Sequence, residues 1–518
     1  MVVEVPRILF LMPKDIYKNW PIQNDFSRRF NRIPSVTYPL LAALSDGFEC
    51  DIFDGLVRPI SLERYCELIR RYQVVCINCV SSAVALNTEV NIRLIKRLAP
   101  GIKIVLGGQH ATFFSQEWLS KGADFVVRGE AEIAFPKLLR AIRDNAGYEA
   151  VAGLSYTLDH GRKTFHNPDQ EFIADLDQSP MPRWDKLDFK PYDLECGSGG
   201  YTATLETARG CRHNCNFCVS GAMWQRTQRY KSIPRVLAEI KALYGLGVRE
   251  IFIADDNFGS DASRVMSIFD AVLRSGLKIN FKSFLRADVA VKNPDLLSAA
   301  ARAGLKEVFI GFESLNEQDL KLFAKGYSTE TVGQYQNVYK ELQARNIAVH
   351  GLFLLGYPGQ KELRHPYRLY QYVRKICDVG MFADYQPNIG LVRSHSTYNI
   401  GETVFKTGNM FYYDRTLVPF TINGQRPRNR SGFMNLLSLF PLLNIDHFLK
   451  RTPRGWILRR IYKSLVQSIA FEVDLKMVRC LLIRIWPFMS VDKKLQLLWE
   501  QYAGDRQVGL LLKKANPN

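Results

Sequence analysis

Hydrophobic runs alternate with amphipathic stretches through the first 145 residues. Short apolar runs predict β-strands at 7–13, 50–55, 74–80, 103–108 and 124–129. Between two of them, Val90, Leu94 and Arg97 fall at helical spacing, with the apolar positions on one face. Continuous apolar strands separated by helices indicate a parallel sheet that is covered on both faces. The pattern therefore predicts a doubly wound, Rossmann-like α/β domain, which binds its ligand beyond the carboxyl ends of the strands.

A second alternation begins near residue 201. Apolar runs predict strands at 201–208, 250–256, 279–287, 307–314, 348–356 and 383–391. Helical patterns fill the gaps, as in 232–247, where Ser232 is the expected N-cap and a glycine closes the helix. Six β/α units in sequence predict a partial (β/α)6 barrel of the TIM type, with its chemistry at the carboxyl-end rim.

Two further segments complete the predicted organisation. Residues 146–200 contain a hairpin pattern around 152–168, followed by a stretch rich in proline and turn formers. From 396 the sequence is first turn-rich and aromatic and then mainly helical, with basic amphipathic patterns. The predicted division is a front domain, a connector, a partial barrel and a C-terminal helical cap over the barrel mouth: 1–145, 146–200, 201–395 and 396–518.

The composition of the 518-residue chain is typical of a globular protein from a reducing compartment. Its ten cysteines are too scattered for a disulfide scaffold, and Cys76 and Cys79 lie within a run that predicts a buried strand, where core packing is expected. Neither a signal peptide nor an apolar run of about 18 residues is found, so a cytoplasmic protein is expected. The net charge is +18, and residues 396–518 contribute 19 Lys and Arg against 8 Asp and Glu.

Three cysteines stand out from the rest. Cys211, Cys215 and Cys218 form a CxxxCxxC pattern just after the first predicted barrel strand, among Arg, His and Asn rather than apolar residues. Three thiolates can hold a metal, but a closed structural site usually has four ligands. Structural zinc, with His213 or another cysteine as the fourth ligand, is the alternative, although His213 lies between two of the ligands, which makes a tetrahedral site awkward.

With Phe217 before the last cysteine, this loop resembles that of the radical S-adenosylmethionine enzymes. The resemblance implies that the three thiolates hold three irons of a [4Fe–4S] cluster. The fourth iron is then left open for the amino and carboxylate groups of S-adenosylmethionine. Reductive cleavage of the sulfonium would give a 5′-deoxyadenosyl radical, which is chemistry of the cofactor.

The resemblance continues along the later barrel strands. It implies that Asp255, Asp256 and Asn257 contact the ribose or amino group of S-adenosylmethionine. It also implies that Arg286 pairs with the methionine carboxylate, in a bidentate geometry that lysine could not reproduce. Glu313, at the end of the fourth strand, is a further candidate ligand for the cosubstrate.

A doubly wound domain ahead of such a barrel resembles the cobalamin-binding subclass of this family. The motifs GGQHAT and VVRGEAE follow two strands, and paired glycines let backbone approach a corrin closely. The resemblance implies a cobalamin site formed by Ser81, Ser82, Gly107, Gly108, Gln109, His110, Gly129 and Glu130. The Asp-x-His-x-x-Gly motif that supplies a lower histidine ligand in some cobalamin proteins is absent, so no histidine ligand to cobalt is expected.

The leading functional prediction is a cobalamin-dependent radical methyltransferase acting on an unactivated carbon of a hydrophobic substrate, such as a tetrapyrrole or polycyclic lipid. A ring-forming cyclase, like the anaerobic tetrapyrrole cyclases, is the alternative, and a non-enzymatic iron–sulfur or cobalamin carrier is another. The expected partners are the substrate and an external one-electron reductant, flavodoxin or ferredoxin. The C-terminal basic helices suggest a peripheral contact with the inner face of a membrane. Nucleic acid is not expected, because no binding module is recognisable.

Overall fold

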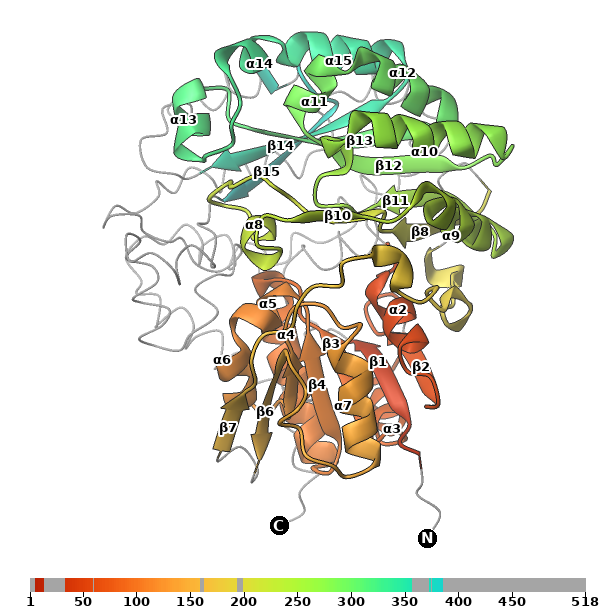
Figure 1. Cartoon of the computed structure of the whole chain (residues 1–518), viewed down its shortest axis with the longest axis vertical. Helices are drawn as coiled ribbons and strands as arrows, with labels where there is room; N and C mark the ends of the chain where they lie inside the picture. The colour runs from red at the N-terminus through yellow and green to blue at the C-terminus, as the bar shows by residue number, and fades with distance from the viewer. Residues whose placement is uncertain are drawn as a thin grey trace, which may run out of the picture.

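The computed structural model is built around two sheets, one above the other in Figure 1. The residues that it describes are 5–13, 33–58, 60–158, 163–192, 199–355, 372–373 and 375–384. The predicted C-terminal helical cap, with its basic helices, lies outside the described residues.

The first sheet has seven strands in the order β2-β1-β3-β4-β5-β6-β7. Its parallel strands are β1 (Ile8–Met12), β2 (Cys50–Asp54), β3 (Val74–Asn78), β4 (Lys103–Gly107) and β5 (Phe125–Val127). All five were predicted from the apolar runs, and the prediction is confirmed. The chain adds β2 on one side of β1 and β3 on the other, so the switch point where such sheets bind ligands lies between β1 and β3.

The predicted hairpin is present and extends this sheet. β6 (Leu154–Leu158) and β7 (Lys163–His166) pair antiparallel with each other, and β6 pairs antiparallel with β5. The hairpin is therefore part of the edge of the front sheet, and only the residues after it run between the two sheets.

Helices cover both faces of the front sheet, as a doubly wound fold requires. They are α2 (Thr37–Ala43), α3 (Leu62–Ile69), α4 (Ser82–Leu98), α5 (Gln109–Phe113), α6 (Ser115–Ser120) and α7 (Ala134–Arg143). Alternate residues of β1 enter different cores: Phe10 packs in one core with Phe135 of α7, whereas Leu11 packs in the other with Tyr65 and Trp118.

The second sheet consists of six parallel strands in the order β8-β11-β12-β13-β14-β15. They are β8 (Tyr201–Leu205), β11 (Val248–Ile253), β12 (Asn280–Leu285), β13 (Leu305–Glu313), β14 (Ala348–Leu355) and β15 (Val379–Asp384). In the described residues this is an open sheet with the strand order of a partial barrel. The last strand begins earlier than the predicted 383–391, most of which lies outside the described residues.

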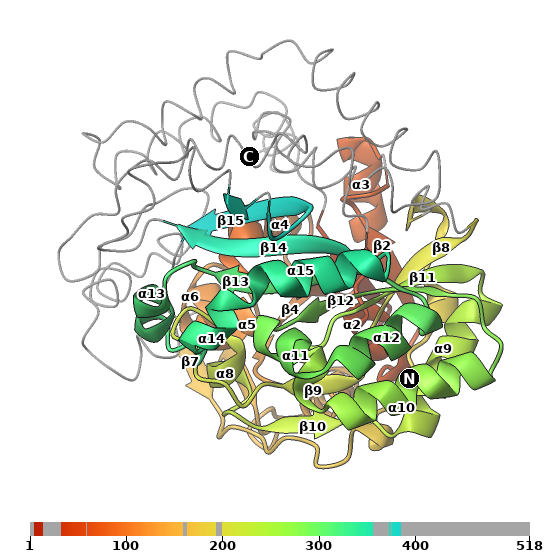
Figure 2. The ribbon, with the colours of Figure 1, turned by 90° about the horizontal axis from the view of Figure 1, so that it is seen from above.

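Helices lie along one face of this second sheet, as Figures 1 and 2 show. They are α9 (Ile233–Gly245), α10 (Ala262–Arg274), α11 (Ala287–Lys292), α12 (Pro294–Ala303), α13 (Glu317–Leu322), α14 (Thr329–Gly333) and α15 (Tyr335–Ala344). The predicted cap of α9 is confirmed, because the Ser232 hydroxyl accepts a hydrogen bond from the Arg235 amide at 3.2 Å. A small antiparallel hairpin, β9 (Ala208–Gly210) with β10 (Gln228–Tyr230), was not predicted.

The opposite face of the second sheet carries a layer of buried charge. Lys282 on β12 lies 3.0 Å from Glu250 on β11 and 3.0 Å from Glu307 on β13. These side chains point away from Phe281, which packs in the core with Phe269 of the covering helix α10. The charges compensate one another across three strands, which is the condition for burying them.

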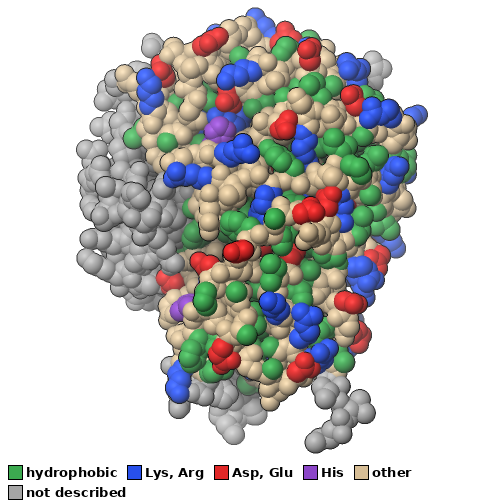
Figure 3. Space-filling model, in the orientation of Figure 1, with side chains coloured by type: hydrophobic (Ala, Val, Ile, Leu, Met, Phe, Trp, Pro, Cys, Tyr) green, Lys and Arg blue, Asp and Glu red, His purple; other side chains and the backbone are tan. Residues whose placement is uncertain are grey.

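The described part of the surface that Figure 3 displays has acidic and basic side chains interspersed over both sheets. Residues 396–518, which carry the basic surplus, lie outside what the structure describes. Among the described residues, no helix has the length and apolar character needed to cross a membrane.

Candidate functional site

The predicted cluster cysteines lie on one loop at the carboxyl end of β8. Cys211 follows β9 directly, and the Cys218 amide donates to the Cys215 carbonyl at 3.1 Å, which makes a tight turn. Cys211 and Cys215 are buried and Cys218 is half-buried. Burial raises the pKa of the Cys211 and Cys215 thiols.

The end of β11 holds the start of this loop through Asp255. Its buried carboxylate accepts the Thr207 amide at 2.6 Å, the Thr207 hydroxyl at 2.5 Å and the Ala208 amide at 3.1 Å. Burial raises the pKa of Asp255 to about 7, although these hydrogen bonds lower it. Asp255 therefore fixes the backbone that leads into the cysteines, and its contact with S-adenosylmethionine stays a prediction.

The next two residues also bond to the segment around the cysteines. The Asp256 carboxylate accepts the Gly210 amide at 3.1 Å and the Ser220 hydroxyl, so it connects the two ends of the cysteine loop. The Asn257 carbonyl accepts the Gln228 side-chain amide at 3.2 Å. Predicted contacts of Asp256 and Asn257 with the cosubstrate are not tested by this geometry.

A buried ion pair lies beside the cysteine loop. Lys325 Nζ lies 2.8 Å from Glu313, and each side chain is 8% exposed. Glu313 ends β13 with φ of +64°, a left-handed conformation that is uncommon for a non-glycine residue and marks a constrained position. Burial lowers the pKa of Lys325, but the Glu313 carboxylate outweighs it and raises this pKa above its ordinary value.

Arg286 joins this group from the end of β12. Its guanidinium contacts Asp288 at 2.9 and 3.1 Å, donates to the Lys325 carbonyl at 2.9 Å and lies 4.8 Å from the centre of the Tyr327 ring. Lys325 and Arg286 both lower the pKa of Cys215 against the effect of burial. These two cations therefore favour the thiolate form of Cys215.

Phe217 and His213 lie on the cysteine loop itself. The Phe217 ring meets Phe323 edge-on at 5.9 Å and lies 5.6 Å from Lys325 Nζ, so it packs the loop against the Lys325 segment. Burial and the charge of Arg286 lower the pKa of His213. His213 therefore lies close enough to Arg286 to be affected by its charge.

These residues fit an iron–sulfur cluster by their chemistry. Among the residues that the structure describes, no three His, Cys, Asp or Glu side chains already form a metal site. The three thiols nevertheless share one loop and act on one another electrostatically, and Lys325 and Arg286 compensate the charge at Cys215. Metal sites commonly draw their ligands together on binding, so Cys211, Cys215 and Cys218 would hold the cluster.

The predicted corrin loops meet at the carboxyl ends of β3, β4 and β5. Gly108 has φ of +92°, and a Cβ there would lie 2.3 Å from the Asn78 side chain and 2.9 Å from the Cys79 carbonyl, so only glycine fits. The Gly129 amide donates to the Thr112 hydroxyl at 3.1 Å, which joins the two loops. At Gly107 and Gly129 a Cβ would meet nothing nearer than 3.8 Å. The space directly beside Gly107 and Gly129 is therefore open.

The other predicted cobalamin residues differ in how far they are buried. His110, on α5 beside Gln109, is buried; its ring stacks on Phe114 at 4.5 Å, and Nδ1 accepts the Trp118 indole N–H at 3.2 Å. Ser81 is exposed, is the N-cap of α4 and makes no side-chain capping bond, and Ser82 is the first residue of that helix. Contacts of these residues with cobalamin stay predictions.

Glu130 has contacts that the sequence did not indicate. Its carboxylate accepts hydrogen bonds from Arg209, from Arg229 and from the Ile173 amide. These partners lie 79, 99 and 43 residues away along the chain, so no local pattern could have revealed them. Lys325 was missed too, although the AKG turn after α13 placed it close to the predicted Glu313 segment.

Family models match both halves of the chain. The B12 binding domain matches residues 39–139, and the radical SAM superfamily matches residues 205–364. The first match covers the corrin loops, and the second covers the cysteine loop, Arg286, Glu313 and Lys325.

Individual relatives match large parts of the chain. An uncharacterised methyltransferase of Pyrococcus horikoshii is 26% identical over 62% of this chain and 69% of its own length. An anaerobic magnesium-protoporphyrin IX monomethyl ester cyclase of Synechocystis is 28% identical over 58% of this chain and 62% of its own length. A hopanoid C-3 methylase of Methylococcus capsulatus is 29% identical over 43% of this chain and 42% of its own length. The chain thus spans between two fifths and about two thirds of these relatives.

Solved structures share the fold. The radical S-adenosylmethionine methyltransferase TsrM of Kitasatospora setae, with cobalamin and a [4Fe–4S] cluster bound, has a TM-score of 0.59 and 14% identity, over 76% of this chain and 75% of its own. The cobalamin-dependent S-adenosylmethionine radical enzyme OxsB has a TM-score of 0.57 and 16% identity, over 98% of this chain and 76% of its own. With both domains matched and the thiols and glycines in place, the chain belongs to the cobalamin-binding radical S-adenosylmethionine enzymes, whose cofactors are a [4Fe–4S] cluster, S-adenosylmethionine and cobalamin.

Proposed function

We propose that this enzyme is a C-methyltransferase that replaces hydrogen by methyl at an unactivated carbon of a flat, hydrophobic substrate. The observation that carries the proposal is the direct contact between the two cofactor domains. Glu130 follows β5 of the front sheet, and Arg209 precedes Cys211 beyond β8 of the second sheet; the two side chains lie 2.8 Å apart. The carboxyl ends of both sheets, where each domain binds its cofactor, thus approach each other.

The bound cofactors would supply a 5′-deoxyadenosyl radical and a transferable methyl group. The net reaction consumes two molecules of S-adenosylmethionine and two electrons. It yields methylated substrate, S-adenosylhomocysteine, methionine and 5′-deoxyadenosine, which takes the substrate hydrogen. An external flavodoxin or ferredoxin would supply the electrons, because nothing in the net reaction does. Lys325 and Arg286 would offset the negative charge of the three thiolates, and Arg286 would orient a carboxylate.

The character of the substrate is inferred from the inner face of the second sheet. Phe252, Phe284 and Phe309 occupy adjacent strands there, with ring centres 5.4–5.8 Å apart, and Phe284 is 37% exposed. Phe284 lies two residues before Arg286, so these rings form the layer just below the proposed cosubstrate. Below them is the charged layer around Lys282. A rigid apolar ring system would stack on such rings.

Two relatives support this choice by their names: the hopanoid C-3 methylase and a bacteriochlorophyllide d C-12(1)-methyltransferase of Chlorobaculum tepidum. The alternative is an oxidative cyclase, which is favoured by three magnesium-protoporphyrin cyclases among the relatives. Methylation consumes the methyl group of S-adenosylmethionine, whereas cyclisation does not.

The test is anaerobic incubation of reconstituted protein with S-adenosylmethionine, cobalamin and a low-potential reductant. We expect both 5′-deoxyadenosine and S-adenosylhomocysteine, and Cys215→Ser should abolish the former because an alkoxide is a poor ligand for the cluster. 5′-Deoxyadenosine without S-adenosylhomocysteine would favour the cyclase. If neither product forms, the carrier alternative remains. Full cleavage of S-adenosylmethionine by Cys215→Ser would refute the proposed cluster ligands.

A further inference from the structure

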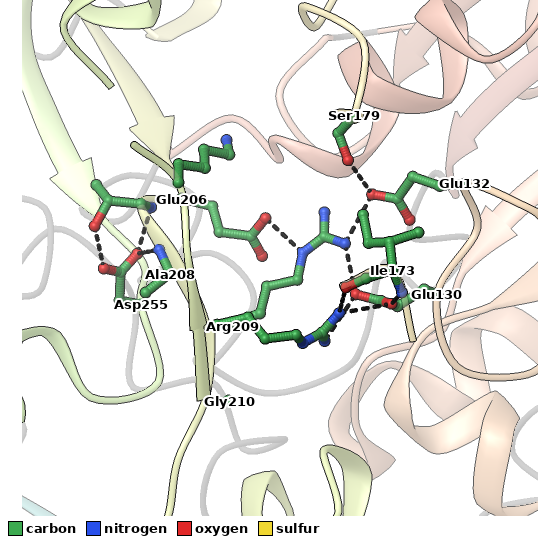
Figure 4. A network of polar contacts seen from close by, with 12 residues as sticks. Glu130, Glu132, Ile173, Ser179, Glu206, Ala208, Arg209, Gly210 and Asp255 are labelled. Carbon is green, nitrogen blue, oxygen red and sulfur yellow. Dashed lines mark hydrogen bonds and ion pairs between the residues drawn. The ribbon is translucent and has the colours of Figure 1, made fainter. Parts of the chain in front are cut away.

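A buried group of five charged residues joins the two domains. We call Arg209, Arg229, Glu130, Glu132 and Glu206 the Arg209 cluster. Arg209 is at its centre, with a side chain 6% exposed, and it lies 2.8 Å from Glu130, 2.7 Å from Glu132 and 2.8 Å from Glu206. Figure 4 shows its guanidinium reaching from the β9 strand toward carboxylates of the front domain.

The front-domain carboxylates are fixed from several directions. Arg229 on β10 donates to Glu130 at 2.9 and 3.0 Å, and the Ile173 amide donates to Glu130 at 2.9 Å. The Ser179 hydroxyl donates to Glu132 at 2.9 Å. Both guanidiniums come from the two strands of the same hairpin, so the hairpin and the segment 129–132 form one bonded unit.

This unit lies next to both predicted cofactor loops. Glu130 follows Gly129, whose amide is bonded to Thr112 in the neighbouring corrin loop. Arg209 lies two residues before Cys211, so their Cα atoms are at most about 7 Å apart. A displacement of Glu130 is therefore transmitted through one side chain to the first cluster ligand.

The arrangement is better suited to fixing geometry than to adding stability. Three carboxylates face two guanidiniums, and buried ion pairs contribute little net stability because desolvation offsets their attraction. A guanidinium, however, has a planar fork of donors in fixed directions, so it holds several carboxylates at defined angles. Lysine would supply the charge without those directions.

We propose that Arg209 is a positioning residue that sets the register between the corrin loop, 127–132, and the cysteine loop, 210–218. The two loops then move as one body, and the methyl-carrying cofactor keeps a fixed position relative to the cosubstrate on the cluster. The inference rests on the proposed function for its meaning in catalysis, but its structural part concerns the cofactor-free chain and is testable there.

The first experiment measures amide hydrogen exchange in the cofactor-free, full-length protein. In Arg209→Gln we expect exchange to rise at least tenfold in both 129–133 and 210–218, while the β12 segment 280–285 stays unchanged. Arg209→Lys should give a rise of at least threefold in both loops, and it decides the outcome if the glutamine variant does not fold. Arg345→Gln is the control, because Arg345 pairs with Glu341 on α15, outside the site. A rise in one loop only, or an equal rise in 280–285, would overturn the proposal.

The second experiment uses protein loaded with cluster and cobalamin. We expect the spin–spin interaction between reduced cluster and cob(II)alamin to be uniform in the unsubstituted protein and broadened in the Arg209 variants. Methyl transfer from S-adenosylmethionine to cob(I)alamin, expressed relative to the substrate-free release of 5′-deoxyadenosine by the same protein, should fall at least tenfold. Unchanged spin coupling and unchanged methyl transfer would overturn the catalytic part. A protein that loads neither cofactor would refute the proposed function, and the exchange experiment would still decide the role of Arg209.

Discussion

Lys325→Met should destabilise the barrel strongly because it leaves the Glu313 carboxylate buried without its cation. The N–O distance is 2.8 Å, and both side chains are 8% exposed. Removing one partner of a buried pair typically costs about 3–5 kcal/mol, because the remaining charge loses compensation but stays desolvated. The methionine retains most of the apolar volume of the lysine stem, so the cavity contribution should be small.

The chain supplies a matched control four residues earlier. Lys321 also lies 2.8 Å from its partner, Glu317, but its side chain is 71% exposed. Water already solvates both of these charges, so Lys321→Met should leave the urea midpoint unchanged within error. The two pairs have the same N–O distance and differ strongly in the exposure of the lysine.

The measurement is equilibrium urea unfolding of cluster-free protein, followed by circular dichroism. Glu313→Gln combined with Lys325→Met should recover much of the loss, because neither side chain then carries a charge. We expect a coupling energy of at least about 2 kcal/mol between the two positions, near the upper part of the range for contacting residues. A Lys325→Met protein with the stability of Lys321→Met would refute the reasoning, as would a double variant as unstable as the sum of the singles.

Three further predictions follow from other positions. Cys76→Ala and Cys79→Ala should each lower stability by about 1 kcal/mol and leave iron content and turnover unchanged, since both thiols lie buried in the front domain; loss of iron would contradict this. The cob(II)alamin spectrum should show no histidine-nitrogen coupling, because the chain lacks the Asp-x-His-x-x-Gly motif and Nδ1 of His110 already accepts the Trp118 N–H; a coupling that disappears in His110→Ala would make His110 the lower ligand. For Asp255, burial raises the pKa to about 7 from an ordinary 3.8, so the folded protein binds this proton more tightly than the unfolded chain. Its contribution to the free energy of unfolding should therefore fall by roughly 1.4 kcal/mol per pH unit as pH rises from about 4 to 7. In Asp255→Asn, the free energy of unfolding measured in urea should lack this fall with pH. If the unsubstituted protein and Asp255→Asn had parallel pH profiles, the prediction would be wrong.

Both sheets could be predicted from the sequence because their strands are continuous apolar runs, such as ILFLM in β1. The β9–β10 hairpin could not, since ARG and QRY are short, polar segments separated by the cysteine loop. The last strand, β15, begins at Val379, four residues before the predicted 383–391, because the prediction passed over the more apolar VGMFAD segment.

The candidate site divides in the same way. The spacing of the cysteines is local, so the loop could be recognised, and its position beyond β8 followed from the barrel pattern. The partners of Asp255 and Glu130 could not be predicted, because each carboxylate meets groups brought to it by folding. For Asp255 these are backbone and hydroxyl donors on another strand end, 48 residues away.

The charged contact between Glu130 and Arg209 has a consequence for how the chain folds during synthesis. The front domain leaves the ribosome first, and its sheet and helices can pack before residue 209 has been made. At that stage Glu130 and Glu132 face water, which solvates carboxylates well. An apolar docking surface would instead expose a patch prone to aggregation while the barrel is still being translated. At this charged contact the carboxylates therefore stay solvated until Arg209 and Arg229 are made, and the ion pairs then select one way of joining the two domains.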